Sequence, residues 1–144
     1  MALHNHLLVN GYVLLPPTEE KTTIDWMAQL VQDIDMKVIQ GPFASYVTKE
    51  GNRGLTAVVM IETSHIAMHV WDEEDPAFLQ FDLYTCSTLP VEKVLKNLEV
   101  LQQVLSLRNI QKVLMLLLLE DTPLQSKMVL LLETLKMPPR LKKS

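Results

Sequence analysis

The chain has 144 residues, of which 48% are hydrophobic, so it can bury a core of its own and is not expected to be disordered. Its net charge of −4 at pH 7, and the lack of a basic stripe carrying aromatic residues, exclude nucleic acid as an expected partner. The one cysteine, Cys86, excludes a disulfide framework within the chain. The first residues lack a signal-peptide pattern, and the longest apolar run, residues 113–119, is too short to cross a bilayer. We therefore expect a cytoplasmic protein with no membrane contact.

The first half of the chain predicts a strand, a helix and a group of further strands. Residues 6–15 read as a strand that ends at two prolines. A helix follows, with Thr22 or Thr23 as its N-cap, and its apolar side chains recur on one face: Ile24, Met27, Ala28, Val31 and Ile34. Residues 36–47, 55–62 and 65–71 are predicted strands. The alternation over residues 78–86 indicates a half-buried strand with one apolar side: Leu79, Phe81, Leu83 and Thr85.

The second half predicts a helix, a strand and a last helix. The second helix begins near Pro90 and carries an apolar stripe: Val91, Val94, Leu95, Leu98, Leu101 and Leu105. Residues 110–120 read as a buried strand and residues 122–137 as an extra C-terminal helix. The element order predicts a single domain, 1–144, of the α/β (α+β) class, a two-layer sandwich whose mostly antiparallel sheet carries two helices on one face. The other face must be solvated, carry a site or pack on a second copy.

Most of the reactive side chains lie in or beside one segment, ETSHIAMHVW (residues 62–71). If this segment is a strand, His65, His69 and Trp71 lie on one of its faces. Polar residues of the next strand can lie on the same face of the sheet: Asp82, Tyr84 and Cys86. Histidines four residues apart on a strand are separated by about 13 Å, and CxxC and HExxH motifs are absent, so we predict no metal site. Cys86 and His69 facing each other across strands would be a nucleophile and its base, whereas a buried Cys86 would be a small hydrophobe.

The order of these residues carries a family resemblance. The segment SHIAMHVWDE followed by FDLYTC resembles the bacterial S-adenosylmethionine decarboxylase proenzymes. The family pattern is close to Glu-Ser-His, two or three residues, His-Thr-Trp-Pro-Glu, and then a strand ending Phe-Thr-Cys. The resemblance follows the element order over residues 6–120 and is strongest over residues 56–86. These proenzymes cut themselves and depend on a pyruvoyl group.

The resemblance implies that the chain is cut between Thr63 and Ser64, and that Ser64 becomes the pyruvoyl cofactor. His69 matches the histidine that assists this processing, and Thr56 stands where the family has a serine that also helps. The Ser64 hydroxyl would attack the Thr63 carbonyl to form an ester, whose elimination and hydrolysis leave a ketone. Because Ser64 and His69 are five residues apart, a regular strand would place them on opposite faces, so we expect Ser64 to lie on a turn or bulge.

The resemblance also implies the substrate and the residues that meet it. The ketone would form a Schiff base with the amine of S-adenosylmethionine and act as an electron sink for decarboxylation, a step in spermidine (polyamine) synthesis. Cys86 matches the acid that returns a proton after carbon dioxide leaves. Trp71 matches an aromatic residue that stacks on adenine, and Glu73 an acid that binds the ribose hydroxyls. The family implies a homodimer.

Several positions depart from the family pattern and leave alternatives open. Thr63 stands where the family has glutamate, with Glu62 one residue earlier, and Asp72 replaces the usual proline. Phe43 or Tyr46 would have to complete an adenine sandwich with the indole. One alternative is an unprocessed relative that binds a nucleoside or regulates a partner. Another is a processed decarboxylase of a different amino acid.

Overall fold

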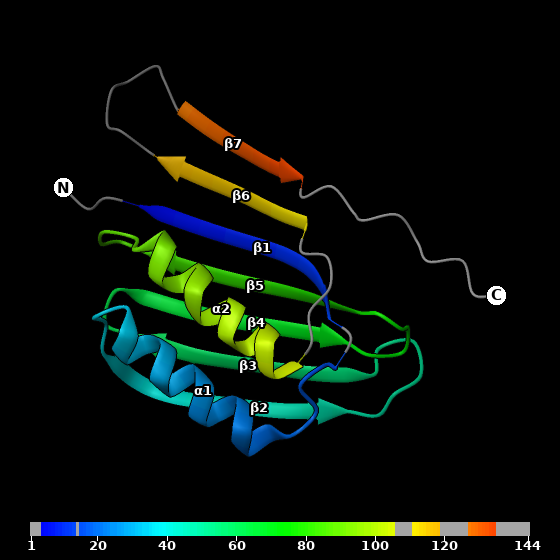
Figure 1. Ribbon diagram of the computed structural model, residues 1–144. Helices are drawn as coiled ribbons and strands as arrows, with labels where there is room; N and C mark the ends of the chain where they lie inside the picture. The colour runs from blue at the N-terminus through cyan, green and yellow to red at the C-terminus, as the bar shows by residue number, and fades with distance from the viewer. Residues whose placement is uncertain (1–3, 14, 106–110, 119–126, 135–144) are drawn as a thin grey trace.

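A five-stranded antiparallel sheet organises the molecule, with strand order β1-β5-β4-β3-β2 (Figure 1). The computed structural model describes residues 4–13, 15–105, 111–118 and 127–134, with side chains up to residue 98. The strands of this sheet are β1 (Asn5–Val13), β2 (Val38–Val47), β3 (Gly54–Ile61), β4 (Ser64–Trp71) and β5 (Ala77–Thr85). The strand predictions over the first 86 residues are therefore confirmed, with ends shifted by up to two residues.

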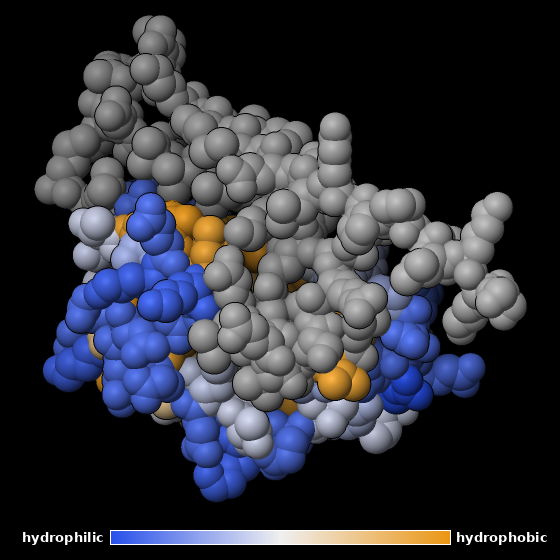
Figure 2. All heavy atoms as spheres, in the orientation of Figure 1, coloured by the Kyte–Doolittle hydropathy of each residue, from blue (hydrophilic) through white to orange (hydrophobic). Residues whose placement is uncertain are grey.

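The core lies between this sheet and a helical layer. In the described residues, α1 (Glu20–Asp33) and α2 (Val91–Leu105) cover the same face of the sheet (Figure 1). Every second residue of β5 is buried, so the predicted apolar side of that strand is confirmed. The outward side of the helical layer is mainly hydrophilic where α1 lies (Figure 2). Neither described helix is long and apolar enough to cross a membrane.

The apolar face of α1 is rotated slightly from the predicted one. Met27 and Val31 are buried as expected, but Ile24 is only half-buried, whereas Thr23 and Leu30 are fully buried. The periodicity places a stripe correctly but its edges depend on where the helix axis sits over the sheet.

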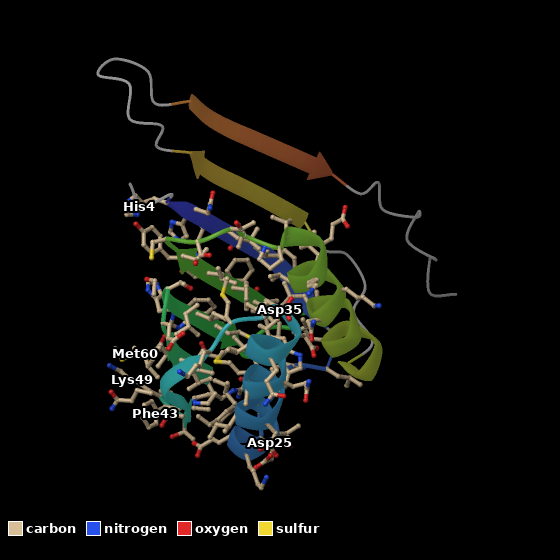
Figure 3. The ribbon with its side chains drawn as sticks, turned by 90° about the vertical axis from the view of Figure 1, so that its left-hand side faces the viewer. His4, Asp25, Asp35, Phe43, Lys49 and Met60 are labelled. Carbon is tan, nitrogen blue, oxygen red and sulfur yellow. The ribbon has the colours of Figure 1, made fainter. Side chains whose placement is uncertain are left out.

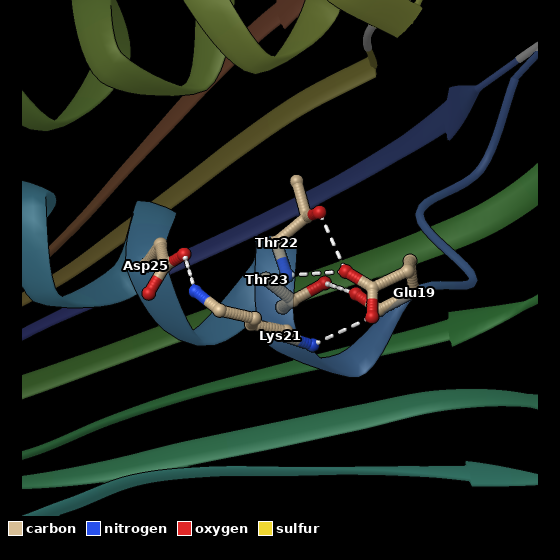
Figure 4. A network of polar contacts seen from close by, with 5 residues as sticks. All are labelled: Glu19, Lys21, Thr22, Thr23 and Asp25. Atoms are coloured by element: carbon tan, nitrogen blue, oxygen red, sulfur yellow. Dashed lines mark hydrogen bonds and ion pairs between the residues drawn. The ribbon is translucent and has the colours of Figure 1, made fainter.

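The N-cap of α1 is Glu19, not the predicted Thr22 or Thr23 (Figure 4). The Glu19 carboxylate accepts hydrogen bonds from the backbone N–H of Lys21 at 3.2 Å and of Thr22 at 2.6 Å. The Thr22 hydroxyl donates to the same carboxylate, and the Thr23 hydroxyl donates to the Glu19 carbonyl. The threonines are donors within the first turn, because an extended glutamate one step earlier already supplies the acceptor oxygens.

The opposite face of the sheet, called here the open face, carries no helix in the described residues. Figure 3 shows Phe43 and Met60 on this side, away from the helices. The exposed fractions of its large side chains are high: Tyr12 40%, Phe43 55%, Val58 39% and Met60 46%. Phe43 is the cross-strand partner of Val58, so three of these residues adjoin one another over β2 and β3. The sheet thus offers an apolar surface beside its polar residues.

The C-terminal part forms a second, two-stranded sheet of β6 (Gln111–Leu118) and β7 (Lys127–Thr134). β6 lies beside β1 (Figure 1). The predicted strand over 110–120 is confirmed, but the predicted helix over 122–137 is wrong where the structure describes it, since 127–134 is a strand. The remainder of 122–137 lies outside the described residues. Short apolar runs do not distinguish a helix from a strand. Here residues 127–134 form a strand because they pair with β6.

Candidate active site

The bond predicted to be cut lies at a tight hairpin turn between β3 and β4. Glu62 and Thr63 form this turn, directly before Ser64, the first residue of β4. The Glu62 carboxylate pairs with the Lys37 ammonium at 2.9 Å, and the Glu62 backbone N–H donates to the Lys37 carbonyl at 2.9 Å. The Thr63 hydroxyl lies 3.7 Å from the Met36 sulfur. Backbone and side-chain contacts therefore fix this turn against the segment that follows α1.

Ser64 has an unusual backbone conformation. Its φ is 139°, and among the described non-glycine residues only Asp35 also has a positive φ. Such a conformation costs on the order of 1–3 kcal/mol and persists only where the surroundings impose it. Neighbouring side chains of a regular strand point to opposite faces, yet the Ser64 hydroxyl oxygen lies 3.1 Å from His65 Nδ1. The irregular backbone at Ser64, expected from the sequence, brings these two side chains together.

The carbonyl before Ser64 is held by the backbone of Cys86. The Cys86 N–H donates to the Thr63 oxygen at 2.9 Å. Cys86 follows the last residue of β5, and it is exposed and has no disulfide partner. A hydrogen-bond donor aimed at a carbonyl stabilises the negative charge that develops there when a nucleophile attacks its carbon. The structure therefore places the serine, the carbonyl predicted to react, and the predicted proton donor at one site.

A cluster of carboxylate, imidazole and phenol side chains adjoins Ser64 on the open face. His6 Nε2 lies 2.8 Å from Asp82 Oδ2, and His65 Nε2 lies 3.4 Å from Asp82 Oδ1. The Tyr84 ring stacks on His65, with 6.0 Å between ring centroids, and meets the edge of His6 at 5.5 Å. His4, which Figure 3 shows at this end of the sheet, contacts the Tyr84 hydroxyl through its Nδ1.

The sequence predicted only part of this cluster. The alternation in β4 and β5 places His65, Asp82 and Tyr84 on one face, as the structure confirms. The contribution of His6 depends on β1 pairing with β5, in which His6 lies opposite Tyr84. That pairing joins segments far apart in the chain, and the one available signal was a histidine in a strand whose alternate residues are apolar.

The other predicted processing residues lie at the far end of β4. Thr56 is the cross-strand partner of His69, and its hydroxyl lies 3.1 Å from His69 Nδ1. The rings of His69 and Trp71 are 5.8 Å apart, and those of Trp71 and Phe78 are 5.7 Å apart. The Trp71 indole N–H donates to the Asn52 side-chain oxygen at 3.1 Å. The predicted processing pair and the predicted adenine-stacking residue are therefore neighbours.

A charged loop lies beyond Trp71 at the same end. The Asp72 carboxylate accepts hydrogen bonds from the Tyr46 hydroxyl at 2.6 Å and from Arg53 Nε at 2.7 Å. Burial raises the pKa of Asp72, but the hydrogen bonds from Tyr46 and Arg53 outweigh burial and leave that pKa below its ordinary value. The Glu73 carboxylate accepts the Gly51 backbone N–H at 2.7 Å, so it too is held by the loop between β2 and β3.

The predicted residues thus form two groups, one at each end of β4. Ser64 and His69 are five positions apart on this strand, which corresponds to roughly 17 Å. His69 lies across from Gln80, not from Cys86, so the alternative Cys86–His69 pair is wrong within one chain. No group of three or more His, Cys, Asp or Glu side chains within the described ranges is placed to hold a metal ion.

Comparisons with known proteins concern the family of the chain. A sequence model described as S-adenosylmethionine decarboxylase matches residues 5–113. The S-adenosylmethionine decarboxylase proenzymes of Thermococcus onnurineus (strain NA1) and Thermococcus kodakarensis (strain ATCC BAA-918 / JCM 12380 / KOD1) are each 44% identical to the chain over 45 residues. Those residues are 31% of this chain and 30% of each relative, so the match spans under a third of the relatives' length.

The fold also has a solved counterpart. The crystal structure of the adenosylmethionine decarboxylase from Aquifex aeolicus VF5 superposes with a TM-score of 0.58 at 21% identity, covering 86% of this chain and 98% of that chain. At this identity the likeness concerns the fold, which is the α+β sandwich predicted from the sequence. The family model covers well over half of the chain, and on that match the chain belongs to the S-adenosylmethionine decarboxylase family.

Proposed function

We propose that the chain is a proenzyme that cuts itself between Thr63 and Ser64 and then decarboxylates S-adenosylmethionine for spermidine synthesis. The observation that carries the proposal is the conformation of Ser64, whose φ is 139° at the bond in question. The Cys86 N–H, 2.9 Å from the Thr63 oxygen, is placed to stabilise charge on that carbonyl. Family membership supplies the reaction class.

The self-cleavage is an exchange of bonds within the chain. The Ser64 hydroxyl oxygen bonds to the Thr63 carbonyl carbon as the peptide bond to the Ser64 nitrogen breaks, which gives an ester and a free amine. Loss of the Ser64 α-proton expels the Thr63 carboxylate. Hydrolysis then takes up water and releases ammonia, leaving a pyruvoyl group on the new first residue. That group supplies the electron sink for decarboxylation. Cys86, exposed beside it, is the proposed proton donor to the product.

The separation of the two groups along β4 supports a homodimer. His69 lies roughly 17 Å from Ser64 along the strand, and Trp71 roughly 23 Å, so neither side chain reaches Ser64 of its own chain. If Thr56 and His69 assist processing, and Trp71 and Glu73 bind substrate, they must do so in a second copy. The apolar open face is the surface through which two sheets would pack.

One observation favours a second candidate function, an uncut relative that binds a nucleoside. Thr63 brings no carboxylate to the turn, and its hydroxyl faces the Met36 sulfur. Such a protein would keep the fold and the Trp71 end of the sheet with Ser64 intact.

Intact-mass spectrometry of the purified full-length chain separates the two. We expect two fragments whose masses sum to that of the 16.4 kDa chain plus water minus ammonia, whereas simple hydrolysis adds water alone. Ser64→Ala should give one uncut chain. Ser45→Ala, at an exposed serine of β2, is the matched control and should be cut. A wild-type chain that stays whole after long incubation would overturn the proposal. If the wild-type chain is cut, carbon dioxide release from a panel of labelled amino acids identifies its substrate.

A further inference from the structure

The imidazole of His65 stands between the serine at the turn and a carboxylate. Its Nδ1 lies 3.1 Å from the Ser64 hydroxyl oxygen, and its Nε2 lies 3.4 Å from Asp82 Oδ1. The family resemblance assigns processing to His69, and it gives His65 no role. In this chain, however, His65 is the histidine in contact with the reacting oxygen.

The contacts of the ring fit the tautomer that a base needs. A serine hydroxyl donates to Nδ1 only when that nitrogen carries no proton, and the proton of a neutral ring then sits on Nε2. Asp82 Oδ1, which that N–H approaches, is buried and has no hydrogen-bond partner among the described residues. Asp82 Oδ2 is held at 2.8 Å by His6. A small tilt of the ring would complete the hydrogen bond from Nε2 to Oδ1.

We propose that His65 is the base for the first step of self-cleavage and that Asp82, held by His6, is its positioning residue. This inference rests on the proposed function. His65 Nδ1 takes the hydroxyl proton as the Ser64 oxygen bonds to the Thr63 carbonyl carbon. The same proton passes to the Ser64 nitrogen as the peptide bond breaks, so nothing is added or lost in this step. The carboxylate keeps the proton of the resting ring on Nε2 and stabilises the charged ring.

In this role His65 acts on Ser64 of its own chain, and His69 can still act on Ser64 of a second copy. The side chain of His65 is 45% exposed in the single chain. In the single chain, before a second copy packs on the open face, the site is accessible to a small base from solution.

The test follows cleavage of the full-length chain over time after a pulse of cell-free synthesis. His65→Ala should be cut about 100-fold more slowly than wild type, and added imidazole should restore much of the rate. Gln29→Ala, at an exposed position of α1 on the other side of the sheet, is the control and should be cut at the wild-type rate. Asp82→Asn should slow cleavage in the wild-type background and have no further effect combined with His65→Ala. His65→Asn, which keeps the size and an acceptor near Nδ1, should also be slow.

The outcomes separate this inference from the proposed function. A wild-type chain that is never cut overturns both. A cut wild type with His65→Ala or His65→Asn cut at the same rate overturns only the role of His65. Slow cleavage that imidazole does not restore makes His65 a structural residue and overturns its role as a base. An additive effect of Asp82→Asn on His65→Ala overturns the role of Asp82. Should His65→Ala fail to fold, His65→Asn decides by the same rule.

Discussion

A mixture of two inactive variants should restore self-cleavage if the site forms between two copies. Ser64→Ala lacks the proposed nucleophile, and His69→Ala lacks the histidine that lies roughly 17 Å away on the same strand. An imidazole reaches only a fraction of that distance, so a chain cannot use both residues on itself. A mixed dimer holds one complete site, made from Ser64 of the His69→Ala chain and His69 of the Ser64→Ala chain.

The expected yield follows from random pairing. In an equal mixture, about half of the His69→Ala chains pair with a Ser64→Ala chain, so about half of them should be cut, and no Ser64→Ala chain should be. Co-synthesis followed by intact-mass spectrometry measures both fractions, and a tag of distinct mass marks each variant. Ser64→Ala combined with His69→Ala in one chain is the control partner and should rescue nothing. Mixed dimers without cleavage, or His69→Ala cut alone at the wild-type rate, would refute the shared site.

Four further variants concern stability and are measured by urea unfolding. Gly54→Ala should destabilise the chain by about 3 kcal/mol or more, because a Cβ there would lie 1.8 Å from the Val70 carbonyl oxygen. Gly51→Ala, at a positive φ with open space around it, should cost only about 1 kcal/mol. Phe81→Ala empties the centre of the core and should cost about 3–5 kcal/mol. Asp72→Asn should cost about 1–2 kcal/mol above pH 5 and progressively less on acidification. The folded state favours the ionised carboxylate, as the lowered pKa of Asp72 indicates, and this stabilisation is lost as the carboxylate is protonated. An equal cost at pH 3 would contradict this reasoning.

The sequence was most informative where one face of an element is buried. Alternation in β5 and the turn residues around β3 and β4 predicted the strands, and an apolar stripe predicted each helix. The C-terminal segment was misread because residues 127–134 are apolar on both faces, so neither period stands out. The cap of α1 was misassigned because glutamate is a less common N-cap than threonine, although its carboxylate reaches the same backbone groups.

The sequence predicted candidate site residues but not how they are grouped. Motif order named Ser64, His69 and Cys86, and only the strand register shows that Cys86 adjoins Ser64 while His69 does not. The hydrogen bond from the Cys86 N–H to the Thr63 carbonyl and the contact between Thr56 and His69 both depend on how strands pair across the sheet. Local sequence patterns do not encode that pairing. The same reason hid the contact between His6 and Asp82.

The hairpin between β3 and β4 determines the positions of both groups of predicted site residues, one at each end of β4. A two-residue turn pairs Ile61 with Ser64, and the antiparallel register then places Thr56 opposite His69 and Gly54 opposite Trp71. A slip of one residue would move Ser64 off the turn and exchange the faces of every later side chain in β4. Gly54 opposes such a slip, since its approach to the Val70 carbonyl leaves no room for a side chain. The distance between Ser64 and His69 is therefore fixed by backbone geometry. In a dimer that packs the open faces of two sheets, that fixed distance would set where one copy must lie on the other.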